Sequence, residues 1–208
     1  MEILMKKSTV LAVAFVMMGF FAKSQDYAKI QDAFKNSYTH EKAAEYTKAI
    51  EDIKTIYFDS SYEINLRLGW LHYNAGLFTE SMAFYQKAIK VMPLSIEAKL
   101  GFVYPASALG NWDQVKTQYL EIIKIDPKNT TACYRLGLIY YGKEDYTTAF
   151  KYFETIANLY PFDYDIILMM AWTNFKLGKL REAKVLFNKV LMNKPDDTSA
   201  LEGLSYIK

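Results

Sequence analysis

The fold is decided by residues 62–95, YEINLRLGWLHYNAGLFTESMAFYQKAIKVMPLS, because the pattern of this stretch returns every 34 residues. The later units are 96–129, 130–163 and 164–197, and position 32 of every unit is a proline: Pro93, Pro127, Pro161 and Pro195. A fixed period of this length is typical of helical repeat arrays, in which each unit buries its apolar face against its neighbours.

Each unit contains the residues that two antiparallel helices need in order to pack closely. Position 8 is small in three units and valine in the other: Gly69, Gly137, Ala171 and Val103. Position 24 is always aromatic and would fill the gap between the helices: Tyr85, Tyr119, Phe153 and Phe187. Position 15, where glycine can take the left-handed conformation that ends a helix, is Gly76, Gly110 and Gly178 but Glu144 in the third unit.

This pattern resembles the tetratricopeptide repeat family over residues 62–197. The resemblance implies an all-α fold, a right-handed α-solenoid of antiparallel helix pairs, that serves as a binding scaffold. Two features depart from the family pattern. Pro105 lies within the first helix of the second unit, and the tryptophan usual at position 4 is replaced by Asn65, Lys99, Cys133 and Ile167. The phase shared by four units outweighs these departures.

The segments on either side of the four units predict capping elements. Residues 26–61 have apolar residues at helical spacing, but their second helix runs about two residues out of phase with the later units. We therefore expect a degenerate capping repeat there, and a C-terminal capping helix over 198–208. Terminal repeats are expected to be atypical because one side has no neighbour.

The first 24 residues predict a signal peptide. Lys6 and Lys7 precede an uncharged apolar run, 10–22, which is followed by Ala22-Lys23-Ser24. The run has about 13 residues, fewer than the roughly 20 that span a bilayer as a helix. We expect cleavage after Ser24 and export to the periplasm or cell envelope; an uncleaved anchor or a buried helix is the alternative.

Charge and cysteine content narrow the classes of partner and anchor. The chain has 25 basic and 23 acidic residues, and the predicted leader holds three of the former and one of the latter, so the remainder is formally neutral. Neutrality gives no electrostatic case for nucleic acid. The only cysteine, Cys133, lies far from the leader, so we expect neither a lipid-attachment cysteine nor an internal disulfide.

No catalytic or metal-binding pattern is present. The two histidines, His40 and His72, have no cysteine or carboxylate around them at metal-ligand spacing, and the chain has no HExxH, CxxC or glycine-rich phosphate loop. We expect a protein that is not an enzyme, with no catalytic residues, metal site, cofactor or small-molecule substrate.

The resemblance places positions 5, 9 and 12 of each first helix on the concave side of the array. Most of these positions are apolar or aromatic although the core does not need them, and such patches usually mark an interaction site. The predicted partner-binding groove comprises Leu66, Trp70, Tyr73, Leu100, Tyr104, Tyr134, Leu138, Tyr141, Leu168, Trp172 and Phe175.

The apolar character of the predicted groove indicates the kind of partner. Members of the resembled family that clamp an acidic C-terminus use Lys and Asn at positions 5 and 9 of one unit, whereas these positions are apolar in every unit of this chain. We expect a protein or peptide partner that presents an apolar or aromatic segment, as a helix or an extended strand. Three alternatives remain: a structural subunit of an envelope secretion or assembly complex, a homo-oligomer through the same face, and aromatic rings that cover one another.

Overall fold

The computed structural model describes residues 26–207, and within them the chain forms eleven helices and no strand. The predicted leader, residues 1–24, lies outside the described residues. The helices are α1 (Tyr27–Lys42), α2 (Tyr46–Lys54), α3 (Tyr62–Asn74), α4 (Phe78–Val91), α5 (Ile96–Ala108), α6 (Trp112–Ile125), α7 (Thr130–Gly142), α8 (Tyr146–Ala157), α9 (Tyr164–Lys176), α10 (Leu180–Asn193) and α11 (Thr198–Ser205).

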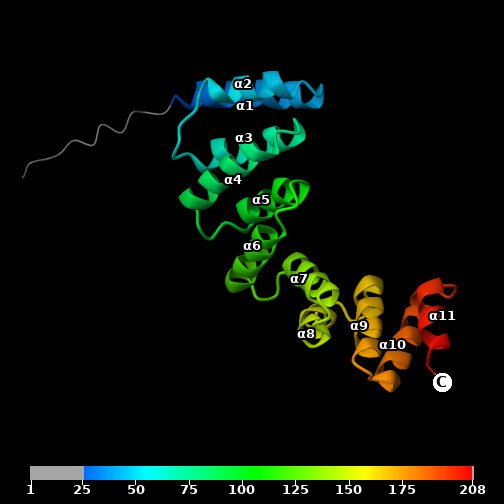
Figure 1. The fold of residues 1–208 in the computed structure, drawn as a ribbon. Coiled ribbons are helices and arrows are strands. Elements are labelled where there is room, and N and C mark those ends of the chain that lie inside the picture. Colours follow the sequence, from blue (N-terminus) through cyan, green and yellow to red (C-terminus); the bar gives the residue numbers. More distant parts are fainter. Residues whose placement is uncertain (1–25, 208) are drawn as a thin grey trace, which may run out of the picture.

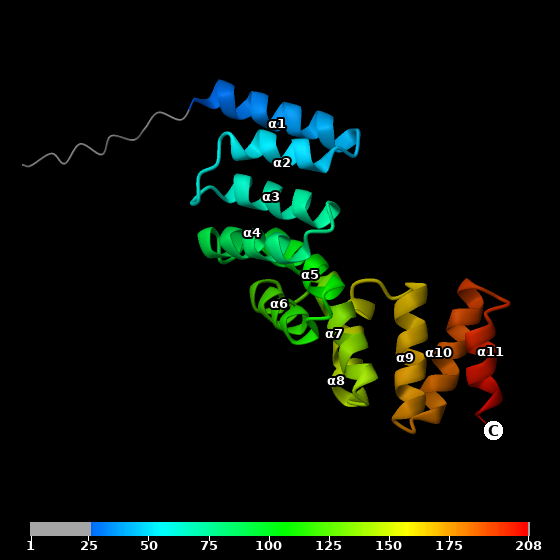
Figure 2. The ribbon, with the colours of Figure 1, turned by 45° about the horizontal axis from the view of Figure 1, so that its top comes forward.

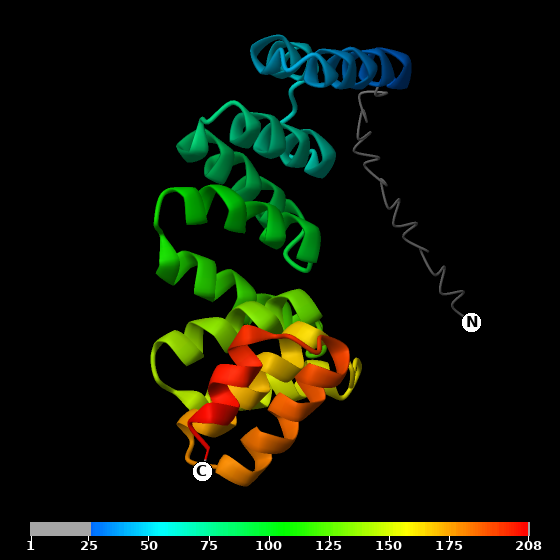
Figure 3. The ribbon, with the colours of Figure 1, turned by 90° about the vertical axis from the view of Figure 1, so that its right-hand side faces the viewer.

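The helices pack as successive pairs in an extended, curved array. Each odd-numbered helix contacts the even-numbered helix that follows it, and each pair contacts the next along the chain. The helix axes turn progressively from α1 to α11, so the two ends of the array present helices in different directions (Figures 1 and 2). Viewed from the side, the pairs follow one another in a continuous stack (Figure 3). The predicted all-α solenoid is confirmed.

The 34-residue period is set locally by helix N-caps. Each first helix from α3 onward begins directly after a Ser, Asn or Asp whose side chain accepts a hydrogen bond from the backbone N–H three residues later: Ser61, Ser95, Asn129, Asp163 and Asp197. These five caps stand 34 residues apart, and each satisfies a backbone donor that would otherwise have no partner.

The aromatic ring at position 24 packs on glycines of two helices. A Cβ atom added to Gly69 would lie 2.9 Å from the Tyr85 ring, and one added to Gly101, in the next repeat, would lie 2.2 Å from it. Gly137 stands in the same relation to Phe153, at 2.4 Å. Any side chain at these glycines would displace the ring, so the close packing of helices depends on them.

The turn between the helices of a pair requires a left-handed residue. Gly76, Gly110 and Gly178 have φ of 75°, 72° and 73°, and Glu144, the exception in the sequence pattern, has φ of 61°. Glu144 therefore adopts the same turn at a steric cost that glycine avoids.

Glu144→Gly is expected to raise the free energy of unfolding by about 1 kcal/mol, because glycine removes the clash of Cβ with the backbone at positive φ. Urea unfolding followed by circular dichroism measures the change. The neighbouring Lys143, which has φ of −90°, provides the control. Lys143→Gly should instead lower stability, because glycine there only adds freedom to the unfolded chain. Stabilisation by both substitutions would contradict the argument.

The opening pair departs from the later repeats in length and phase. Helix α1 has 16 residues where the later first helices, α3 to α9, have 13, and Ala44, with φ of 59°, takes the left-handed turn position. Helix α2 begins at Tyr46, two residues later than the 34-residue spacing from Phe78 would place it, as predicted. Between residues 26 and 207, no helix is long and apolar enough to cross a membrane.

Candidate peptide-binding groove

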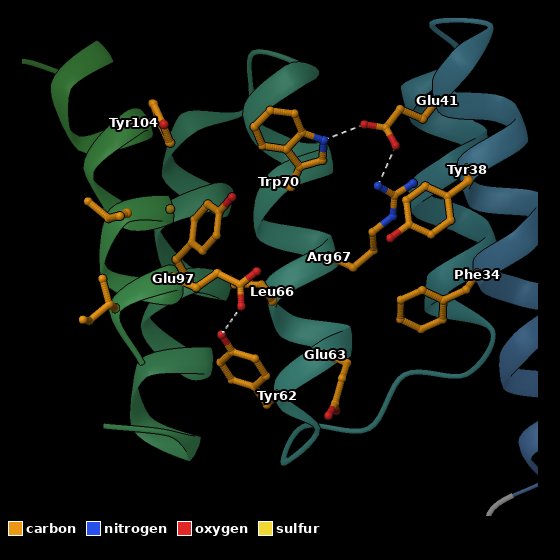
Figure 4. Close-up of a pocket in the computed structure, with 14 residues that line it drawn as sticks. Phe34, Tyr38, Glu41, Tyr62, Glu63, Leu66, Arg67, Trp70, Glu97 and Tyr104 are labelled. Atoms are coloured by element: carbon orange, nitrogen blue, oxygen red, sulfur yellow. Dashed lines mark hydrogen bonds and ion pairs between the residues drawn. The ribbon is translucent and has the colours of Figure 1, made fainter. Parts of the chain in front are cut away.

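Four of the predicted groove residues line one cavity on the concave side of the N-terminal half. Leu66 and Trp70 of α3 and Leu100 and Tyr104 of α5 surround a space of about 900 Å³ that is closed on its third side by α1. Figure 4 shows these helices side by side, with the labelled side chains turned into the space between them. We call this cavity the groove.

The floor of the groove is apolar. Leu66, Leu100 and Tyr85 line it together with Gly101. The Tyr85 ring, which is only 3 % exposed, packs against Gly101, where a Cβ would clash with it. Burial raises the pKa of the Tyr85 hydroxyl, so the floor is uncharged at any physiological pH.

The α1 wall consists of Phe34, Tyr38 and Glu41, none of which the repeat pattern predicts as a groove residue. Arg67 of α3 joins this wall to the rest of the array. Its guanidinium donates to Glu41 Oε2 at 2.6 Å and to Ser37 Oγ at 3.0 and 3.2 Å, and its Cζ lies 3.9 Å from the centroid of the Tyr38 ring. Arg67 is only 6 % exposed, so this pairing is largely shielded from solvent.

An aromatic ridge borders the groove on α3 and α5. Trp70 and Tyr104 are 39 % and 52 % exposed, and the half-buried Tyr73 lies between them, with ring centroids 6.2 Å from Trp70 and 5.6 Å from Tyr104. Trp70 Nε1 donates to Glu41 Oε1, which fixes the indole across the gap to α1 (Figure 4). Large, exposed and oriented rings of this kind supply contact area at low entropic cost.

The opposite end of the groove is acidic. Glu97 Oε2 accepts a hydrogen bond from the Tyr62 hydroxyl at 2.8 Å, and the same hydroxyl lies 2.7 Å from Ser95 Oγ. Glu63 accepts from Ser61 Oγ at 3.0 Å. Figure 4 places Tyr62, Glu63 and Glu97 together, away from Trp70 and Glu41. Both carboxylates lie in the first turn of a helix, where the helix dipole favours negative charge.

A second cavity of about 610 Å³ adjoins this end. It shares Phe34, Tyr62 and Glu63 with the groove, and its remaining lining is mainly apolar: Tyr27, Ile30, Phe58, Ile64, Val91 and Met92. Its residues come from α1, from the turn before α3, from the start of α3 and from the end of α4. Repeat positions gave no signal for them, because the first two sources belong to the opening pair, which is out of phase.

The predicted groove residues of the C-terminal half line neither the groove nor the cavity beside it. Tyr134, Leu138 and Tyr141 are half-buried and pack against the cluster around Phe153. Trp172 has its ring centroid 5.0 Å from that of Phe187 and donates from Nε1 to Ser199 Oγ at 2.9 Å.

Leu168 and Phe175 pack in the same cluster as Trp172, and the Phe175 ring lies 5.9 Å from that of Tyr206, just beyond α11. The expectation that some rings cover one another thus describes this half, where the last helix shields them.

His72 and Cys133, the candidates for metal binding or thiol chemistry, are both buried in surroundings that indicate a structural role. His72 is buried beside Phe84, its Nδ1 donates to the Leu68 carbonyl at 2.7 Å, and burial lowers its pKa. Cys133 is buried, and burial raises the pKa of its thiol, which disfavours the reactive thiolate. Within residues 26–207 no group of three or more His, Cys, Asp or Glu side chains could hold a metal ion.

Comparison with known proteins agrees with the repeat pattern. Two family models, each described as tetratricopeptide repeat, match residues 62–93 and 140–205. Human protein O-mannosyl-transferase TMTC1 is 26% identical over 156 residues, which cover 70% of this chain and 17% of that protein. Human superkiller complex protein 3 is 30% identical over 95 residues, 46% of this chain and 6% of that protein. The chain thus spans less than a fifth of the length of either relative.

Solved structures share the fold at low identity. A tetratricopeptide repeat protein from Parabacteroides merdae superposes with a TM-score of 0.72 at 19% identity, covering 86% of this chain and 72% of that one. MamA protein superposes with a TM-score of 0.68 at 16% identity, covering 86% of this chain and 96% of that one. Two stretches of the chain thus match tetratricopeptide repeat models, and the helix pairs with their 34-residue caps share the fold of solved tetratricopeptide repeat arrays.

Proposed function

We propose that the chain is a non-enzymatic scaffold of the cell envelope that holds an apolar or aromatic segment of a partner protein in the groove between α1, α3 and α5. The observation that supports this most is the groove itself: about 900 Å³ of space with an apolar floor and two exposed, oriented rings at its border. An aromatic cleft of this size matches the anchor side chains of a bound peptide or helix.

Location in the envelope rests on the leader alone. Residues 1–24 have the basic start, the short apolar run and the small residues near the cleavage site that typify exported bacterial proteins. Fusion of residues 1–30 to a reporter that is active only outside the cytoplasm tests this part separately. An inactive reporter would remove the envelope from the proposal without touching the groove.

The binding role is tested by crosslinking from the groove inside the cell. A photo-crosslinking residue at Tyr104 should capture one dominant foreign protein. The same residue at Trp112, which is exposed on α6, the second helix of its pair, should not. Crosslinks only between copies of this chain would favour the alternative, a homo-oligomer that uses the same face. Equal capture from both positions would contradict the groove as the binding site.

A further inference from the structure

The groove and the cavity beside it meet at a carboxylate. Phe34, Tyr62 and Glu63 line both spaces, so a ligand that fills both must cross these three side chains. On either side of this junction the lining is large and apolar: Leu66, Trp70 and Leu100 in the groove, and Phe58, Val91 and Met92 in the adjoining cavity. The surface therefore alternates from apolar to acidic to apolar along its length.

The charge at the junction is not compensated within the described part of the chain. The charged residues that line the two spaces are Glu41, Glu63, Glu97 and Arg67. Arg67 is paired with Glu41. In residues 26–207, no lysine or arginine forms an ion pair with Glu63 or Glu97, whose side-chain partners are the hydroxyls of Ser61 and Tyr62. The junction thus offers the exposed carboxylate of Glu63, and the groove directly beside it offers the exposed carboxylate of Glu97, which is bonded to the Tyr62 hydroxyl.

We propose that the partner presents a segment in which a lysine or arginine is flanked on both sides by large apolar side chains. This inference rests on the proposed function of the groove and adds the chemistry of its ligand. The basic side chain lies between Glu63 and Glu97, beside the rings of Tyr62 and Phe34, where it gains charge-assisted hydrogen bonds and cation–π attraction. Its apolar neighbours fill the groove floor on one side and the Phe58–Met92 cavity on the other.

The same charges reject other ligands. An acidic segment would face two carboxylates that no cation of the described chain neutralises, and like charges brought together oppose binding. A wholly apolar segment would cover Glu63 and Glu97 and remove water from them without giving a partner, which costs free energy. Only a segment that places a cation at the junction and apolar side chains on both sides of it is complementary to both the acidic and the apolar lining.

The test is a selection from a phage-displayed random peptide library on the purified protein, with counter-selection on the Trp70→Ala, Tyr104→Ala double variant. Enriched peptides should carry a lysine or arginine between large apolar residues. Fluorescence anisotropy then measures the best peptide against the wild type and against Glu63→Gln, Glu97→Gln, which removes charge but keeps side-chain shape. The double variant should bind roughly tenfold more weakly, with a difference that shrinks as salt is added.

Glu154→Gln with Glu182→Gln is the matched control, since both glutamates are exposed on the second helices α8 and α10. This variant should bind as the wild type does. Enriched peptides without a basic residue, or binding unchanged in Glu63→Gln, Glu97→Gln, would overturn the basic-segment inference and leave the groove as a binding site. If no peptide distinguishes the wild type from Trp70→Ala, Tyr104→Ala, the proposed function falls as well.

Discussion

Replacing Trp70 and Tyr104 together by alanine is expected to weaken binding of a groove ligand roughly a hundredfold while leaving the helix content unchanged. The two rings border the groove on α3 and α5 and are 39 % and 52 % exposed, so their removal opens no core cavity. The loss falls on contact with the ligand, since large oriented rings dominate the energetics of such sites. Anisotropy titration of a selected peptide measures affinity, and circular dichroism measures helix content.

The control for this prediction is a pair of apolar residues outside the groove that are even more exposed than Trp70 and Tyr104. Trp112 and Val185, on the second helices α6 and α10, are 64 % and 62 % exposed. Trp112→Ala with Val185→Ala should leave affinity and helix content as they are in the wild type. A similar loss of affinity in both double variants would mean that binding is not confined to the groove.

Trp172 is not a suitable partner in this experiment, although it occupies the same repeat position as Trp70. Its ring packs edge-on against the fully buried Phe187, and its indole N–H is bonded to Ser199. Alanine there would leave a cavity beside Phe187 and a hydroxyl without its donor, so stability would fall together with any binding. Equal positions in a repeat do not guarantee equal surroundings near the end of an array.

The parts of the fold that the sequence predicts are those set by local rules. A glycine at position 15 ends the first helix in three of the four units, and a proline at position 32 stops each second helix. Small and aromatic residues repeat at the same positions because each repeat packs on its neighbour in the same way. A pattern that recurs four times is therefore enough to predict the solenoid.

The groove was predicted only in part, because one of its walls comes from the helix that breaks the pattern. Phe34, Tyr38 and Glu41 lie on α1, whose pair is out of phase, so no repeat position identifies them. The contacts of Ser37, Tyr38 and Glu41 with Arg67 span 26 to 30 residues of sequence and depend on how the first two pairs stack. The N-terminal half has an open groove, whereas α11 shields Trp172 and its neighbours in the C-terminal half. This shielding is a property of the assembled array.

Arg67→Met is expected to destabilise the docking of α1 and α2 by about 3 kcal/mol, because it leaves the partly buried Glu41 without its cation. It also removes two hydrogen bonds to Ser37 and the guanidinium that lies over Tyr38. Native-state hydrogen exchange should show faster exchange in α1 and α2, with α9 and α10 unchanged, since an array loses stability nearest the broken contact. The groove loses one wall in the same step, so affinity for a groove peptide should fall too.

Arg135→Met separates this effect from the loss of an arginine in general. Arg135 occupies the same repeat position two units later, but it is exposed, so its removal should change neither exchange nor affinity. If Arg67→Met loosens α1 and α2 while groove binding persists, the opening pair is only a cap and the ligand contacts α3 and α5 alone. If both fall together, the pair that departs most from the repeat pattern is part of the binding site. Its phase shift then has a functional consequence, because it sets the position of the α1 wall across the groove from Trp70.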